Sequence, residues 1–96
     1  MPLFALHALD RADSLPLRLE HYADHRAFVE TAPEYGLHIM LSGPLQSDDG
    51  EIMTGSLLII EAPDRTSVEH FVKADPFVRA GLWENITISR FHRRKG

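Results

Sequence analysis

Apolar and polar residues alternate with two different periods along the chain, and the order of these periods predicts the order of the elements. Four stretches have the apolar runs or the strict alternation of strands: 3–9, 37–45, 53–61 and 83–92. Two stretches have apolar residues at helical spacing: 14–35 and 64–74. The resulting order, βαββαβ, predicts a single domain over 1–96 with a ferredoxin-like α+β fold, in which a four-stranded antiparallel sheet carries both helices on one face.

Residues that end helices and strands mark the boundaries of the first half. Ser14, followed by Pro16, starts the first helix, and Gly36 lies where a left-handed residue ends one. Pro33 falls inside the last turn of that predicted helix. The dipeptide Gly43-Pro44 interrupts the apolar run that follows, which indicates a bulge or the end of regular strand pairing.

The second helix is predicted to be followed by a short helical turn. Asp64 or Thr66 caps the helix, with Glu69 three residues after Thr66 as in a capping box. Pro76 disfavours helical geometry at the residue before it, so the helix ends by residue 73 or 74. Asp75 is then placed to cap a turn that begins at Pro76.

Two basic residues lie on the predicted buried stripe of the first helix. Leu15, Tyr22 and Val29 recur at helical spacing, and Arg18 and His25, seven residues apart, point about 20° from each other on the same stripe. A buried cation must be paired or hydrogen-bonded, or it must line a cavity that holds a polar ligand. This stripe is therefore the first candidate for a functional site.

The sequence leaves the roles of these two groups open. Arg18 either pairs with Asp75 or Glu61, or holds an anionic substrate or a developing enolate charge. His25 is either a core histidine satisfied by hydrogen bonds or a general acid or base, since imidazole titrates near neutrality.

Composition and charge exclude several classes of function. The 96 residues are 44% hydrophobic and 25% charged, with a net charge of −4, and contain no apolar run of the length that a membrane helix needs. Only the tail 90–95 is basic, which argues against a nucleic-acid partner. Cysteine is absent, which excludes disulfides and thiolate chemistry. The start of the chain lacks the pattern of a signal peptide, so we expect a cytoplasmic protein.

Strands that are apolar on both sides predict a second subunit. Residues 3–9 and 57–60 carry apolar side chains on both faces, whereas the helices cover only one face of the sheet. The remaining face needs another cover, so we expect a homodimer.

A set of short motifs resembles one known family. They are Arg18 with His25, Gly43-Pro44-Leu45, Asp49-Gly50, Gly55-Ser56, Glu61-Ala62, Asp75-Pro76-Phe77 and Gly81-Leu82. In order and spacing, over nearly the whole chain, they resemble the YciI-like proteins, which are small dimeric α+β-barrel proteins with a ferredoxin-like fold. Where many such proteins approach the histidine with Arg-Pro-Ala-His, this chain has 22–25 as Tyr-Ala-Asp-His.

The resemblance implies a site and a range of reactions. It implies a cleft in which a His and an Asp form a catalytic dyad, and these map onto His25 and Asp75. The family includes a dehydrochlorinase that acts on chlorinated hydroxyquinols, so the implied function is a cofactor-free lyase or isomerase that transfers a proton on a small, oxygenated cyclic substrate. The residues expected to bind that substrate, an anionic molecule in one interpretation, are Arg18, His7, Gly43, Ser56 and Phe77. The alternative is a non-catalytic module for small-molecule binding or dimeric interaction, because fold alone does not decide function.

A metal or organic cofactor is not expected. His21 and His25 have the i, i+4 spacing that can bind zinc on one helix face, but neither a third ligand nor the glutamate of the zincin motif accompanies them. No phosphate-binding or dinucleotide-binding motif occurs.

Overall fold

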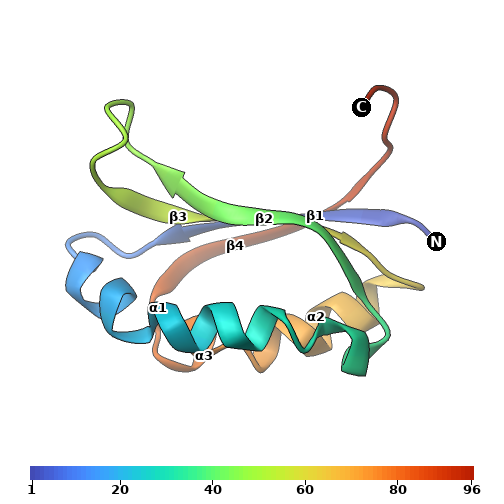
Figure 1. The fold of residues 1–96 in the computed structure, drawn as a ribbon, viewed down its shortest axis with the longest axis horizontal. Helices are drawn as coiled ribbons and strands as arrows, with labels where there is room; N and C mark the ends of the chain where they lie inside the picture. Colours follow the sequence, from blue (N-terminus) through green and yellow to red (C-terminus); the bar gives the residue numbers. More distant parts are fainter.

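The computed structural model describes residues 1–96 as one layer of strands packed on one layer of helices (Figure 1). The elements follow in the order β1 Leu3–Asp10, α1 Leu15–Val29, the 3₁₀ helix η1 Ala32–Tyr35, β2 His38–Gln46, β3 Met53–Glu61, α2 Arg65–Lys73, α3 Pro76–Arg79 and β4 Trp83–Phe91. The strands form a four-stranded sheet in the order β2-β3-β1-β4. Every neighbouring pair is antiparallel, which confirms the predicted ferredoxin-like fold.

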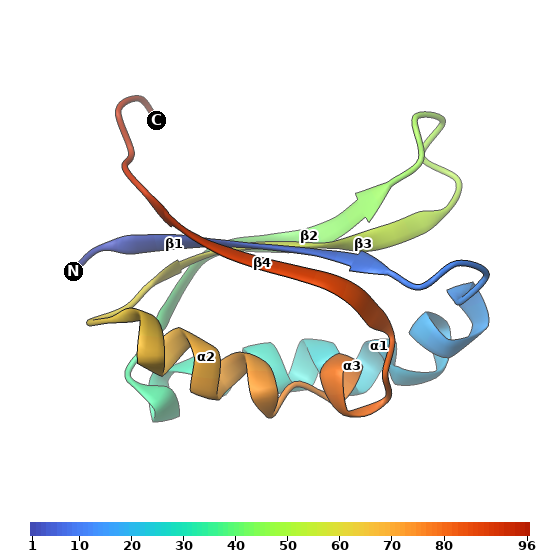
Figure 2. The ribbon, with the colours of Figure 1, turned by 180° about the vertical axis from the view of Figure 1, so that it is seen from behind.

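All the helices lie on one face of the sheet, as two opposite views show (Figures 1 and 2). The core fills the space between the two layers. Side chains of alternate residues on β1, namely Phe4, Leu6 and Ala8, are buried there, as are Leu58 and Ile60 of the neighbouring β3. The helices supply further buried residues to the same cluster: Val68, Phe71, Val72 and Phe77.

The first helix ends six residues earlier than the sequence pattern predicts. Instead of continuing to Tyr35, α1 stops at Val29 and the chain forms η1 before Gly36 takes the left-handed conformation, with φ of 76°. Pro33 explains the difference, because its ring would clash with the carbonyl group of Val29, four residues earlier, and it has no N–H to donate to that carbonyl.

The predicted interruption at Gly43-Pro44 is also wrong, because β2 runs through both residues. The register shifts lie on either side instead, between Ile39 and Leu41 and between Leu45 and Gln46. A proline is tolerated here because β2 is an edge strand. One side of the strand has no neighbouring strand, and a missing N–H on that side removes no hydrogen bond from the sheet.

The cap of α2 is Asp64, one of the two residues considered for that role. Its carboxylate accepts a hydrogen bond from the backbone N–H of Ser67, at 2.8 Å, and this bond lowers the pKa of Asp64. The predicted capping box does not form. Glu69 pairs with Arg65 instead, at 3.4 Å, across one turn of the helix.

The second face of the sheet carries apolar side chains and no cover from the chain itself. Leu9, Leu41 and Phe91 are 40%, 53% and 44% exposed, and Leu57 and Ile59 are half-buried. The register places Leu41 beside Ile59, and Phe91 beside Leu3. We call this surface the open face.

None of the helices has the length and apolar character needed to cross a membrane.

Two glycines on adjacent strands provide a test of the sheet packing. A Cβ atom at Gly55 would overlap the backbone carbonyl oxygen of Ala8, whereas one at Gly43 would meet no atom within 4 Å. Gly55→Ala should therefore lower the free energy of unfolding by about 1–3 kcal/mol, because β1 and β3 must move apart. Gly43→Ala should leave it unchanged within about 1 kcal/mol. Urea denaturation of both variants measures the difference, and equal stabilities would contradict this packing.

Candidate functional site

His25 and Asp75 form a buried hydrogen-bonded pair between α1 and the start of α3. Nδ1 of His25 lies 2.9 Å from each carboxylate oxygen of Asp75. The two residues are 7% and 1% exposed. The sequence thus correctly predicted that His25 faces inward, and the fold brings together the two residues assigned to the dyad, which lie fifty positions apart.

Asp75 is held in place by the helix that it caps. Its Oδ1 accepts the backbone N–H of Phe77 at 2.9 Å, and Pro76 occupies the first turn of α3, where a missing N–H costs nothing. The predicted cap is therefore confirmed. One carboxylate serves both α3 and His25, so the position of the imidazole is fixed relative to the backbone.

The contact with Asp75 also determines which imidazole nitrogen is free. An ionised carboxylate only accepts hydrogen bonds, so Nδ1 must carry the proton that it shares with Asp75. In the neutral ring, Nε2 then has the lone pair and is the nitrogen able to accept a proton.

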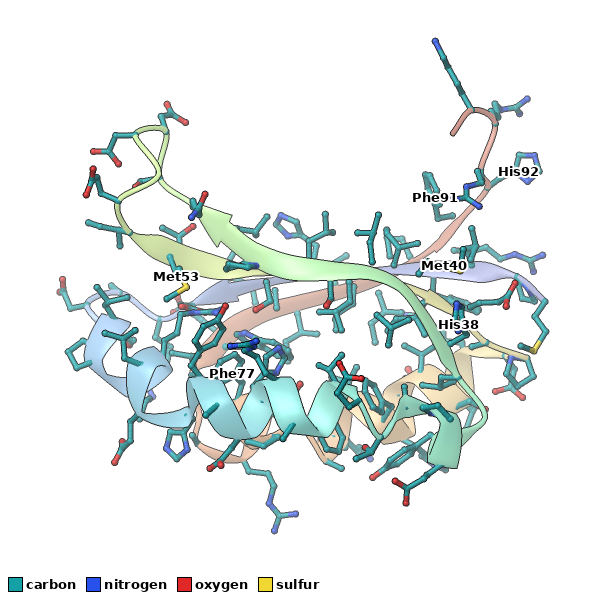
Figure 3. All side chains as sticks on the ribbon, in the orientation of Figure 1. His38, Met40, Met53, Phe77, Phe91 and His92 are labelled. Carbon is teal, nitrogen blue, oxygen red and sulfur yellow. The ribbon has the colours of Figure 1, made fainter.

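Aromatic side chains surround the imidazole on its buried side. The ring of Phe77 stacks on His25 at a centroid distance of 4.2 Å and an interplanar angle of 14°, and Trp83 meets His25 edge-on at 6.0 Å. Phe77 lies between the sheet and α1 (Figure 3). The indole Nε1 of Trp83 is buried and has no hydrogen-bond partner in the chain. These rings hold the imidazole in one orientation and keep water from that side.

Arg18 is fully buried, and its partner differs from both candidates weighed in the sequence. Its Nε and Nη2 donate to the two carboxylate oxygens of Asp10, at 2.7 and 2.9 Å, and Nη2 also donates to the hydroxyl of Ser56 at 2.9 Å. Neither Asp75 nor Glu61 pairs with it. Its guanidinium carbon also lies 4.7 Å from the centre of the Phe77 ring, so Arg18 and His25 contact the same aromatic side chain.

A cavity of about 180 Å³ opens beside His25, between α1 and the edge strand β2. We call it the α1–β2 cavity. It is lined by Tyr22, His25, Arg26 and Val29 of α1, by Glu30 directly after that helix, and by Ser42, Gly43 and Pro44 of β2. His25 is therefore accessible from this side, although its other contacts are buried.

A larger cavity, of about 480 Å³, lies at the other end of α1 and does not include His25. It is lined by the loop from Asp10 to Ser14, the first residues of α1 and the start of β3. Because neither His25 nor Asp75 reaches it, the smaller α1–β2 cavity is the better candidate for chemistry.

The expected substrate-binding residues fall into three groups. Gly43 lines the α1–β2 cavity. Arg18, Ser56 and Phe77 lie in the buried structure that supports His25 and do not line that cavity. His7 is exposed on the open face of the sheet, because Leu6 and Ala8 on either side of it point toward the helices. The expectation that His7 lines the same cleft is therefore not met within the chain.

The structure adds residues that sequence reasoning did not assign to the site. Asp10 ends β1 with its carboxylate toward Arg18. The sequence could have indicated this, because side chains alternate along a strand and Asp10, two residues after the buried Ala8, points to the same face of the sheet. Arg26 and Ser42 line the α1–β2 cavity. No group of three or more His, Cys, Asp or Glu side chains is close enough together to hold a metal, and His21 lies beside Glu20.

Comparison with known proteins agrees with this architecture. Residues 2–92 match the YCII-related domain. The chain belongs to the YCII-related family. It is 30% identical over 94 residues to the protein YciI of Escherichia coli O6:H1, covering 93% of this chain and 95% of that protein, and equally similar to YciI of Shigella flexneri.

Among solved structures, this YCII-related chain is similar to the 5-chloro-2-hydroxyhydroquinone dehydrochlorinase TftG of Burkholderia phenoliruptrix AC1100, solved in complex with 2,5-dihydroxybenzoquinone. The two share 36% identity and a TM-score of 0.84 over 95% of this chain and 94% of that one. The protein PA3566 of Pseudomonas aeruginosa, at 19% identity and a TM-score of 0.54 over 98% and 95% of the two chains, shares the fold.

The burial of Arg18 gives a prediction for stability. Asp10→Ala should lower the free energy of unfolding by about 3 kcal/mol, because it leaves a buried guanidinium without its carboxylate. The double variant Asp10→Ala, Arg18→Met should recover much of that loss, since no unpaired charge remains. Denaturant titration of the two variants tests the pair. A single variant as stable as the wild type would show that Asp10 does not compensate Arg18.

Proposed function

We propose that this protein is a cofactor-free enzyme of the lyase or isomerase type, in which His25 and Asp75 transfer a proton on a small, oxygenated cyclic substrate bound in the α1–β2 cavity. The observation that carries the proposal is that Nδ1 of His25 lies 2.9 Å from a buried carboxylate while His25 also lines a cavity. This is the arrangement that a general base requires, since the carboxylate fixes the tautomer and stabilises the imidazolium once it forms.

The proposed step needs no redox partner. Nε2 of His25 accepts a proton from a hydroxyl or carbon of the substrate, and the electron pair of that bond forms a new C=O or C=C bond. In a lyase, a leaving group such as chloride departs with the electron pair of its bond to carbon, and the imidazolium then releases its proton to solvent. In an isomerase, the imidazolium returns the proton to another atom of the substrate. Asp75 stays ionised throughout and balances the charge on His25.

Similarity to TftG supports a substrate of this class. That protein is a dehydrochlorinase of a chlorinated hydroxyhydroquinone, and the similarity covers 95% of this chain and 94% of TftG. Loss of HCl is a proton transfer coupled to departure of a leaving group, which is the chemistry available to His25. The α1–β2 cavity, of about 180 Å³, has room for a molecule of one ring.

Substitutions at the dyad separate chemistry from stability. Asp75→Asn should lower turnover on the order of 10²–10⁴-fold while the cap of α3 survives, because asparagine caps a helix as well as aspartate but cannot stabilise an imidazolium. His25→Gln should abolish turnover. Asp75→Ala should lose both the activity and about 1 kcal/mol of stability. Rates on hydroxylated and halogenated ring compounds, with unfolding midpoints, measure both effects.

If Asp75→Asn and His25→Gln both kept full activity, the pair would be structural. The protein would then be better explained as a non-catalytic binding module, in which the polar residues satisfy one another.

We further propose that the enzyme is a cytoplasmic homodimer in which a second copy covers the open face. Burying the apolar side chains of that face is favourable by about 25 cal/mol per Å². Ile59→Lys places a charge at its centre and should convert the dimer to monomer, whereas Leu19→Lys, on the exposed side of α1, should not. Sedimentation of the wild type and both variants at micromolar concentration decides. A monomeric wild type would contradict this assembly.

A further inference from the structure

We propose that Arg26 binds a negatively charged oxygen of the substrate and thereby selects ionised hydroxyquinones and phenolates over neutral rings. This inference rests on the proposed function, because it concerns the ligand of the same cavity. It assigns the anion contact to Arg26 and not to Arg18, the basic residue that the sequence pattern suggests for that role.

Arg18 is not available to an anionic ligand. Its Nε and Nη2 are engaged by both oxygens of Asp10, and Nη2 also by Ser56, while the side chain is completely buried. The charge of the Arg18 guanidinium is compensated by the Asp10 carboxylate inside the protein. Arg18 also does not line the α1–β2 cavity, so an anion bound there does not reach its guanidinium.

Arg26 has the opposite properties. It lines the α1–β2 cavity together with His25, and its side chain is exposed. No carboxylate lies within 4.0 Å of its guanidinium, since the ion pairs of the chain involve Arg18, His21, His25 and Arg65. The charge of Arg26 is therefore free to pair with a ligand.

Tyr22 holds the Arg26 side chain near the cavity. The guanidinium carbon of Arg26 lies 5.7 Å from the centre of the Tyr22 ring, one helical turn earlier, and Tyr22 lines the same cavity. A guanidinium presents several N–H donors in one plane, which suits the oxygen of a carboxylate, phenolate or ionised quinone. A ligand bound in this cavity therefore meets a wall that includes both His25 and Arg26.

The other charged groups around the cavity give the proposal an internal control. Glu30 lines the same cavity and repels an anion, whereas the charge of Asp75 lies behind the imidazole of His25. Removing the charge of Arg26 and removing that of Glu30 should therefore change anion affinity in opposite directions. Neither side chain is buried, so both variants are expected to fold.

The probe is 2,5-dihydroxybenzoquinone, whose hydroxyl groups are vinylogous carboxylic acids and are ionised at neutral pH. Titration calorimetry should show roughly tenfold weaker binding to Arg26→Gln and tighter binding to Glu30→Gln than to the wild type. Arg94→Gln removes the same charge from the tail after β4 and should bind as the wild type does. The neutral ring hydroquinone should bind equally to Arg26→Gln and the wild type.

Three outcomes would overturn the inference, and they have different meanings. If Arg26→Gln binds the quinone as tightly as the wild type, Arg26 is not the anion contact, and the proposed function is unaffected. If Arg26→Gln loses affinity for the quinone and for hydroquinone alike, Arg26 contributes to the shape of the cavity but does not distinguish charged from neutral ligands. If the wild type binds neither probe, the proposed function fails and this inference fails with it.

Discussion

The candidate site depends on one carboxylate that makes two contacts. Asp75 caps α3 and at the same time binds Nδ1 of His25, so a backbone feature of one helix determines the orientation of an imidazole on another. Phe77, the residue whose N–H Asp75 accepts, is also the ring on which His25 stacks. The short sequence Asp-Pro-Phe therefore supplies the cap, the helix start and the aromatic platform of a single imidazole.

The buried ion pair of Arg18 and Asp10 contacts the same aromatic ring as the hydrogen-bonded pair of His25 and Asp75. Arg18 and His25 lie on one stripe of α1, and each contacts Phe77. A burial of two basic groups on one helix is costly unless each has a carboxylate, and the fold provides Asp10 for one and Asp75 for the other. The stripe thus combines an internal structural pair with a pair that reaches the α1–β2 cavity. This division explains why a basic residue in a helix stripe is a weak guide to an anion site.

The sequence predicted those features that depend on neighbouring residues. The bounds of β3, the cap at Asp75 and the inward direction of Arg18 and His25 follow from turn residues and helical spacing, and the structure confirms them. Features that depend on distant partners were missed or wrong. Helical spacing shows that Arg18 faces inward, but only the packing of α1 against the end of β1 shows that Asp10 receives it. The sequence did not show on which face of the sheet His7 lies, because β1 is apolar on both faces and its pattern does not distinguish them.

The central claim is that Asp75 fixes His25 as the Nδ1–H tautomer with Nε2 directed to a ligand. The most direct measurement is the long-range ¹H–¹⁵N spectrum of histidine-labelled protein, at a pH where the ring is neutral, before and after addition of 2,5-dihydroxybenzoquinone. We predict that His25 shows a protonated Nδ1 and a bare Nε2, and that the Nε2 signal shifts on addition while that of exposed His70 on α2 does not. A His25 with its proton on Nε2, or one whose signals do not respond to the quinone, would contradict the account.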